Sequence, residues 1–272
     1  MKFDAYAGNV SGVRPEQLAE LLAFGTKGRM SRGKPRGRYA DVFEVGQLPA
    51  DGSVWVGHDR QLEAAYFEVK GATTPPAVET IRRHFAGAHA VSRMDSCEDY
   101  SDPGSYSRLV AVIDESCDPR VKSHAWQPRL DDAAPATTYW GSTQSRVQVR
   151  CYEAGKMAER AHHGRPDWVR VEAQVRPGKA AEKLAAASVS ALDVWGYSAW
   201  SKRAAEKLST VEVQRFAPET GGASFEKTTL YVARAFRRHW EEMLADYGDW
   251  VCIGREIEEI WQLDDEAKAG KR

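Results

Sequence analysis

Short segments with alternating apolar and polar residues recur between positions 39 and 214, and they constrain the fold more than any other feature of the chain. Such segments, bounded by turn residues, are typical of β-strands. Two helical patterns interrupt them, over 76–85 and 179–199. Clustered strands with occasional helices favour an α+β fold with a predominantly antiparallel sheet packed by helices. We expect strands at 39–45, 54–57, 64–70, 91–99, 109–114, 137–141, 146–153 and 168–176.

The two ends of the chain carry different signals. A helix is predicted over 15–24, because a proline opens it, leucines form a stripe and Gly25 ends it. Near the other end, a linker at 217–222 precedes apolar residues at helical spacing. We therefore predict three parts. They are an N-terminal helix and basic arm (1–38), a catalytic domain (39–216), and a linker with a C-terminal helical subdomain (217–272).

Two stretches of the central region resemble each other weakly. A Trp-Val-Gly triplet at 55–57 precedes the segment 66–71, and a Tyr-Trp-Gly triplet at 139–141 precedes the segment 150–156. The tyrosine follows the glycine of the triplet by 9 residues in the first stretch (Gly57 to Tyr66) and by 11 in the second (Gly141 to Tyr152). The pattern raises the question of a duplicated unit without answering it.

The composition excludes several classes of protein. The 272 residues are 42 % hydrophobic and 28 % charged, which is ordinary for a globular chain that buries a sizeable core. No run approaches the roughly 18 apolar residues that a membrane helix needs. The four cysteines lie far apart without CxxC spacing, so we expect neither a zinc site nor a disulfide framework. These features predict a reduced, cytoplasmic protein without membrane contact.

The net charge of −1 gives no global bias toward a partner, but the segment 27–38 is strongly basic. It holds six bases, three glycines and no acid, so we expect a loop or arm. Basic residues among glycines, followed by an aromatic residue, resemble a loop that binds the phosphates of a nucleic-acid backbone. An ordinary solvated loop is the alternative. The candidate DNA contacts are Lys27, Arg29, Arg32, Lys34, Arg36 and Arg38.

Alternation along three predicted strands gathers polar side chains on one face. This face holds one tyrosine, three carboxylates and several guanidinium groups, from Arg146, Arg150, Tyr152, Arg170, Glu172, Asp95 and Asp99. One interpretation is a half-solvated sheet of mixed charge. The other is a site that acts on phosphate, where carboxylates hold Mg²⁺ or Mn²⁺ and basic groups hold the phosphate.

Four motifs occur in an order that resembles the replication initiation factor family. They are Arg93-x-Asp95-x-x-x-Asp99, an aromatic-Gly-Ser-x-x-Ser stretch from Trp140 to Ser145, Arg150-x-Tyr152-x-x-x-Lys156, and Arg170-x-Glu172. The family comprises trans-acting rolling-circle replication initiators of plasmids and filamentous phages, and related conjugative relaxases. The resemblance covers residues 38–176, and it departs from the family at Glu153, where Asp is frequent.

The resemblance implies a site-specific DNA-nicking and strand-transfer endonuclease. Tyr152 would attack a phosphodiester, form a 5′-phosphotyrosine and free a 3′-hydroxyl that primes synthesis. A free tyrosine has a pKa near 10, so it needs nearby positive charge to react as a phenolate near neutral pH. Arg150 and Lys156 are the expected sources of that charge.

The resemblance also implies a metal ion. Asp95, Asp99 and Glu172 are the expected ligands of Mg²⁺ or Mn²⁺, which would polarise the phosphate. A bulge in the strand 91–99 would bring Glu98 into the place of Asp99.

The expected partner is replication-origin DNA, single-stranded or melted at the nick, with Arg146 and Arg170 as further contacts. A host helicase is a second expected partner. The aromatic segment 229–247 would serve either a homodimer interface or packing on the sheet. Two other functions stay open: a metal-dependent nuclease that uses water, and a non-catalytic DNA-binding regulator of the same fold.

Overall fold

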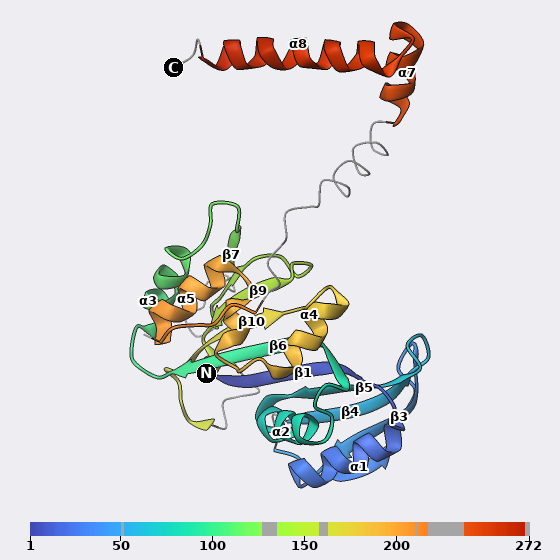
Figure 1. Cartoon of the computed structure of the whole chain (residues 1–272). Helices are drawn as coiled ribbons and strands as arrows, with labels where there is room; N and C mark the ends of the chain where they lie inside the picture. The colour runs from blue at the N-terminus through green and yellow to red at the C-terminus, as the bar shows by residue number, and fades with distance from the viewer. Residues whose placement is uncertain (50–51, 127–134, 158–162, 210, 217–236, 270–272) are drawn as a thin grey trace. The chain divides into compact units, whose positions relative to one another are not determined.

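The computed structural model describes residues 1–49, 52–126, 135–157, 163–209, 211–216 and 237–269. The chain divides into two compact units, Met1–Pro218 and Glu219–Arg272 (Figure 1). The first unit contains a ten-stranded sheet in the order β2-β3-β4-β5-β1-β6-β10-β9-β8-β7. Every neighbouring pair of strands is antiparallel. The predicted α+β fold, with a C-terminal helical region, is confirmed.

The strands of the first unit are β1 Lys2–Val10, β2 Arg29–Arg32, β3 Tyr39–Gly46, β4 Ser53–Asp59, β5 Ala64–Lys70, β6 His89–Tyr100, β7 Ser123–Trp126, β8 Thr137–Trp140, β9 Val147–Tyr152 and β10 Val169–Val175. Its helices are α1 Pro15–Thr26, α2 Thr74–His84, α3 Ser105–Asp114, α4 Ala180–Ala185 and α5 Ala199–Ser209. Short 3₁₀ turns lie at η1 Gly71–Thr73, η2 Ala154–Lys156, η4 Ala186–Ser188 and η5 Asp193–Tyr197. The second unit contains α7 Arg237–Tyr247 and α8 Trp250–Ala269.

The order of elements repeats along the first unit. The series β1-α1-β2-β3-β4-β5-α2 is followed by β6-α3-β7-β8-β9-β10-α4. In the sheet the two series meet at β1 and β6, and their other strands extend outward in mirrored order. The sheet is therefore built from two topological repeats. The sequence echo aligned the wrong strands, because it set β4 against β8, whereas β4 corresponds to β9 in the sheet.

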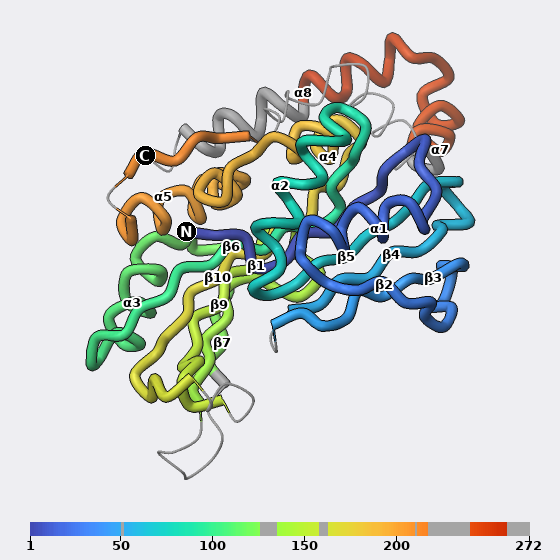
Figure 2. The backbone as a smooth tube through the Cα atoms, turned by 90° about the horizontal axis from the view of Figure 1, so that it is seen from below, coloured from blue at the N-terminus to red at the C-terminus, as the bar shows by residue number. Residues whose placement is uncertain are grey.

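Helices cover one face of the sheet. Helices α1 and α2 contact strands of the first repeat, whereas α3, α4 and η5 contact strands of the second (Figures 1 and 2). The largest side chains of the core between them include Tyr6, Phe67, Trp140 and Trp195, all fully buried. The other face, which we call the open face, carries polar and aromatic side chains from the alternate strand positions.

Residues 1–38 do not form a separate helix and arm. Strand β1 lies at the centre of the sheet, between β5 and β6. The basic segment also contributes an edge strand, because Arg29–Arg32 pairs with β3. Exposed charged side chains are common on edge strands, where they discourage pairing with other chains.

Two predictions of local structure were wrong. Residues 109–114 are the end of helix α3, where Leu109 and Ile113 share its buried side. Residues 179–199 are not one helix but the short pieces α4, η4 and η5. The predicted linker 217–222 lies outside the described residues. No helix in the described part of the chain is long and apolar enough to cross a membrane.

The burial of Trp195 in the core predicts that removing its side chain strongly lowers the free energy of unfolding. This side chain is fully buried, and its indole N–H donates to Ser96 Oγ at 3.3 Å. Trp195→Ala is expected to lower the free energy of unfolding by about 3–5 kcal/mol, because it leaves a cavity. The matched control is Phe24→Ala, since Phe24 is 86 % exposed. It should change the free energy by no more than about 0.5 kcal/mol in urea unfolding. Equal effects of the two variants would contradict this description of the core.

Candidate active site on the open face of the sheet

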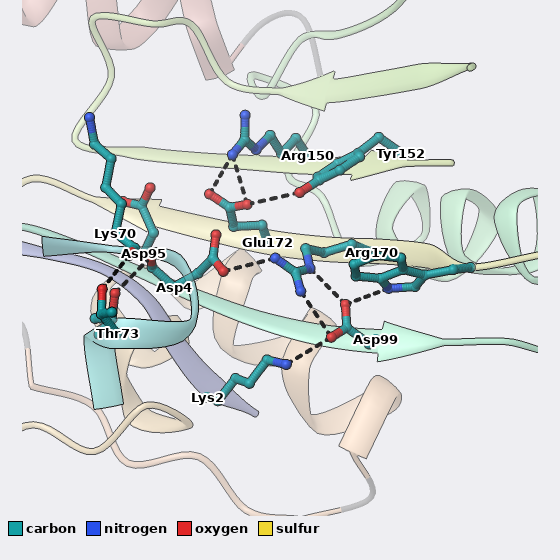
Figure 3. Close-up of polar contacts among 12 residues, drawn as sticks. Lys2, Asp4, Lys70, Thr73, Asp95, Asp99, Arg150, Tyr152, Arg170 and Glu172 are labelled. Carbon is teal, nitrogen blue, oxygen red and sulfur yellow. Dashed lines mark hydrogen bonds and ion pairs between the residues drawn. The ribbon is translucent and has the colours of Figure 1, made fainter. Parts of the chain in front are cut away.

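Three central strands bring several of the predicted site residues together. On β9 and β10, Arg150 lies opposite Glu172 and Tyr152 opposite Arg170. On β10 and β6, Arg170 lies opposite Asp99. Regular alternation along these strands places all five side chains on the open face (Figure 3).

Glu172 is the centre of the first group. Arg150 Nη2 donates to both carboxylate oxygens of Glu172, each at 2.8 Å. The Tyr152 hydroxyl donates to Glu172 Oε2 at 3.5 Å (Figure 3). The guanidinium carbon of Arg150 also lies 5.2 Å from the centroid of the Tyr152 ring. A candidate nucleophile, a carboxylate and a cation are therefore in mutual contact.

The carboxyl of Glu172 is only 1 % exposed, and this burial raises its pKa to about 7. The positive charge of Arg150 opposes the increase, while the negative charges of Asp95 and Asp4 add to it. A carboxyl that titrates near neutral pH can both accept and return a proton, which is the requirement for general acid–base catalysis.

Asp99 belongs to a second group, centred on Arg170. Arg170 donates from Nε to Asp99 Oδ1 at 2.6 Å, from Nη2 to Asp99 Oδ2 at 3.0 Å, and from Nη1 to Asp4 Oδ1 at 2.8 Å. Trp168 Nε1 and Lys2 Nζ also donate to Asp99, at 2.8 and 2.9 Å. Burial alone would raise the pKa of Asp99, but hydrogen bonds and charge from Arg170, with Lys2 and Trp168, hold it well below its usual range.

Asp4 was missed by the sequence analysis. The register of β1 against β6 shifts between Phe3 and Ala5, so Asp4 is the extra residue of a bulge. A bulge redirects a side chain, here toward Arg170. The alternation of residues 2–8 was the available signal for this strand, but alternation does not show a bulge.

Asp95 forms a third group with Arg93, whose Nε donates to Asp95 Oδ1 at 2.9 Å. Gln174 Nε2 donates to Asp95 Oδ2 at 3.2 Å. Each of the predicted metal ligands, Asp95, Asp99 and Glu172, thus has its own arginine. Within the described ranges, no three His, Cys, Asp or Glu side chains are grouped so that they could hold a metal ion.

The predicted ligand set therefore does not fit a metal ion in this arrangement, because arginine donors occupy the carboxylate oxygens that a metal would need. Glu98 does not replace Asp99. It lies opposite Val171, whose side chain is buried in the core, and so it faces away from the open face.

Two of the predicted DNA contacts make hydrogen bonds within the protein. The side chain of Arg170 is only 6 % exposed and is held by two carboxylates. Arg146 lies before β9 begins and donates to Glu182 of α4 and Tyr197 of η5, at 3.3 and 3.4 Å. Both residues therefore contribute to internal contacts.

The six bases of the basic segment are all exposed. Three of them form ion pairs: Arg32 with Asp41 at 3.4 Å, Arg36 with Glu44 at 2.6 Å, and Arg38 with Asp59 at 2.9 Å. Of the other candidates near the tyrosine, Lys156 lies in η2 and pairs with Glu153 at 2.9 Å.

Tyr152 itself is only 3 % exposed. It forms a small apolar cluster with Ala154 and Trp168, against which Met157 packs. The packing of these side chains leaves little of Tyr152 exposed to a substrate. The polar end of Tyr152 nevertheless points toward Glu172 and not into the main core (Figure 3).

The raised pKa of Glu172 predicts that Glu172→Gln flattens the pH dependence of stability. The folded chain holds this proton more tightly than the unfolded chain does. The carboxyl therefore contributes stability that is complete below its ordinary pKa of 4.5 and is lost as the pH rises through about 7. Relative to Glu172→Gln, the wild type should lose free energy of unfolding across this window.

Urea unfolding at several values between about pH 4 and pH 8 measures this difference. Gln148→Met is the control, because Gln148 is a buried side chain of the adjacent strand that does not titrate. It should keep the wild-type pH slope. Parallel profiles for the wild type and Glu172→Gln would contradict this prediction, because they would show that folding does not shift the pKa of Glu172.

Neither a protein-family model nor a curated protein sequence matches the chain. Among solved structures, it is similar to the rolling circle replication initiator protein from Geobacillus stearothermophilus, with a TM-score of 0.51 and 17 % sequence identity. The similarity covers 83 % of this chain and 89 % of that chain. Both the sequence motifs and the sheet thus lead to one structural class. This chain has the fold of a rolling-circle replication initiator.

Proposed function

We propose that the protein initiates rolling-circle replication by nicking origin DNA with Tyr152. The observation that carries the proposal is the contact of the Tyr152 hydroxyl with Glu172, beside Arg150, in a sheet with the fold of an initiator. The fold alone supports the class of protein, and the three side chains support the chemistry. The covalent link would conserve the energy of the phosphodiester and permit later rejoining.

The proposed step transfers a phosphoryl group from one hydroxyl to another. Tyr152 Oη attacks phosphorus, a new O–P bond forms, and the bond from phosphorus to the 3′ oxygen breaks. The tyrosine proton passes to Glu172, which is poised to accept it because its pKa is raised to about 7. The leaving 3′ oxygen takes up a proton from solvent or from Lys156 and becomes the primer hydroxyl.

Arg150 has two roles in this proposal. It orients the Glu172 carboxylate through two hydrogen bonds, and it lies over the tyrosine ring, where its charge favours the phenolate. Its side chain is 39 % exposed, whereas that of Glu172 is 1 % exposed. Arg150 therefore extends from the buried carboxylate to the surface, where a phosphate would arrive.

A non-catalytic DNA-binding regulator is the second candidate function, and one observation favours it. Tyr152 is 3 % exposed, which a purely structural tyrosine would also be. A nuclease that uses water has less support, because the predicted metal ligands are paired with arginines.

Tyr152→Phe is expected to abolish a covalent protein–DNA adduct, because the phenol oxygen is the attacking atom. The assay incubates the full chain with labelled single-stranded origin oligonucleotides and resolves the products on a denaturing gel. Tyr139→Phe is the matched control. Tyr139 of β8 lies opposite Arg150 of β9, and its ring stacks on His124 with ring centroids 5.1 Å apart. The Tyr139→Phe variant should form the adduct normally.

The outcomes separate the candidate functions. An adduct that persists in Tyr152→Phe would show that another residue is the nucleophile. Cleavage without any adduct, lost in Glu172→Ala, would favour the hydrolytic nuclease. DNA binding that weakens with salt, without cleavage under any condition, would favour the regulator.

The requirement for Mg²⁺ or Mn²⁺ stays a prediction that the carboxylate arrangement does not support. Adduct formation measured with each ion and with a chelator tests it. Full activity in the chelator would show that the reaction needs no divalent metal ion.

A further inference from the structure

Three aromatic side chains form a cluster on the open face of the first repeat. Tyr39 of β3 and Tyr66 of β5 stack at 4.5 Å between ring centroids, with an interplanar angle of 27°. Trp55 of β4 lies 5.3 Å from Tyr39 and 5.0 Å from Tyr66. Each of the three side chains is partly exposed. We call these residues the ring cluster.

Two arginines flank the ring cluster. The guanidinium carbon of Arg36 lies 4.8 Å from the centroid of Trp55, and that of Arg38 lies 5.2 Å from the centroid of Tyr39. Their side chains are 45 % and 44 % exposed. Among the described residues, three further exposed bases of the same segment have no ion pair, namely Lys27, Arg29 and Lys34. The rings therefore have two guanidinium groups beside them, which also pair with Glu44 and Asp59.

The ring cluster occupies the place in the first repeat that the candidate active site occupies in the second. Glu68 lies opposite Trp55 in β4–β5, as Glu172 lies opposite Arg150 in β9–β10. Two residues further along β4, Gly57 lies opposite Tyr66 of β5. Two residues further along β9, Tyr152 lies opposite Arg170 of β10. The strand position of the candidate nucleophile is thus a glycine in the first repeat.

The acidic positions differ in the same way. Ala5 and Asn9 of β1 lie opposite Lys70 and Tyr66, where the second repeat has Asp95 and Asp99 opposite Gln174 and Arg170. The first repeat therefore has neither the nucleophile nor these two acids. It presents rings and guanidinium groups at the corresponding place on the same face.

We propose that the ring cluster binds unpaired bases of the DNA strand whose phosphodiester reaches Tyr152. This inference rests on the proposed function and adds where the strand lies. Every nucleobase has a π face that can stack on aromatic rings and on guanidinium planes. The neighbouring basic side chains would contact the phosphates of the DNA backbone. Four strand spacings separate β5 from β9, which amounts to about 19 Å, a span of several nucleotides.

Affinity for a single strand tests the proposal. The affinity of the full chain carrying Tyr152→Phe is measured for a labelled oligothymidylate and for a duplex of the same length. Trp55→Leu and Tyr66→Leu should each weaken single-strand binding about tenfold, because each removes a stacking surface. Tyr66→Phe keeps the ring and should keep the affinity. Duplex binding should change much less, because its bases are already stacked.

Phe24→Leu is the matched control, since it removes an aromatic ring that is 86 % exposed outside the ring cluster. It should bind both probes as the parent does. Thermal unfolding confirms that each variant is folded. Unchanged single-strand affinity in folded Trp55→Leu would overturn the proposal, as would an equal loss for the duplex.

Photocrosslinking locates the bases directly, and it does not need nicking. Oligonucleotides with one 5-iododeoxyuridine at successive positions should crosslink to peptides that contain Trp55 or Tyr66. Crosslinks confined to other peptides would overturn the proposal. An adduct through Tyr152 without ring-cluster crosslinks would leave the proposed function standing and refute the binding surface. Crosslinks to the ring cluster without any adduct would support the binding surface and refute nicking by Tyr152.

Discussion

The pairing of each buried acid with its own arginine is the interaction on which the centre of the sheet depends. A carboxylate removed from water costs several kcal/mol unless a cation and hydrogen bonds replace the lost solvation. Arg150 serves Glu172 in this way, and Arg170 serves Asp99. Because these contacts bridge neighbouring strands, they also fix the open-face side chains relative to one another. The position of the Tyr152 hydroxyl follows from this network.

The same network gives two similar carboxyls different properties. Asp99 accepts donors from Arg170, Lys2 and Trp168, so it stays ionised and structural. Glu172 is more deeply buried and is close to other acids, so its proton is held to near neutral pH. Environments that separate the pKa values of neighbouring acids are a general sign of distinct roles. Here they distinguish an acid that is held ionised by several donors from one that, in the proposed function, takes up the proton of Tyr152.

The success of sequence reasoning followed the regularity of the backbone. Strands β9 and β10 alternate without interruption, so the pattern correctly placed Arg150, Tyr152 and Glu172 on one face. Arg146 lies just outside β9, where alternation no longer applies. Which partner neutralises each acid is a matter of side-chain contacts across strands, and a one-dimensional pattern does not contain it. Helix α3 was misread because its run of consecutive apolar residues has no clear period.

The junction between β1 and β6 has a consequence for the history of the chain. Each topological repeat contributes one of these strands, and their backbone hydrogen bonds join the two halves. A half-length ancestor would have carried that strand as a bare edge, which favours association with a second copy of itself. Fusion of two such genes would turn a symmetric assembly into a single polypeptide. In a single polypeptide each half can carry side chains of its own, as Gly57 and Tyr152 show at corresponding strand positions.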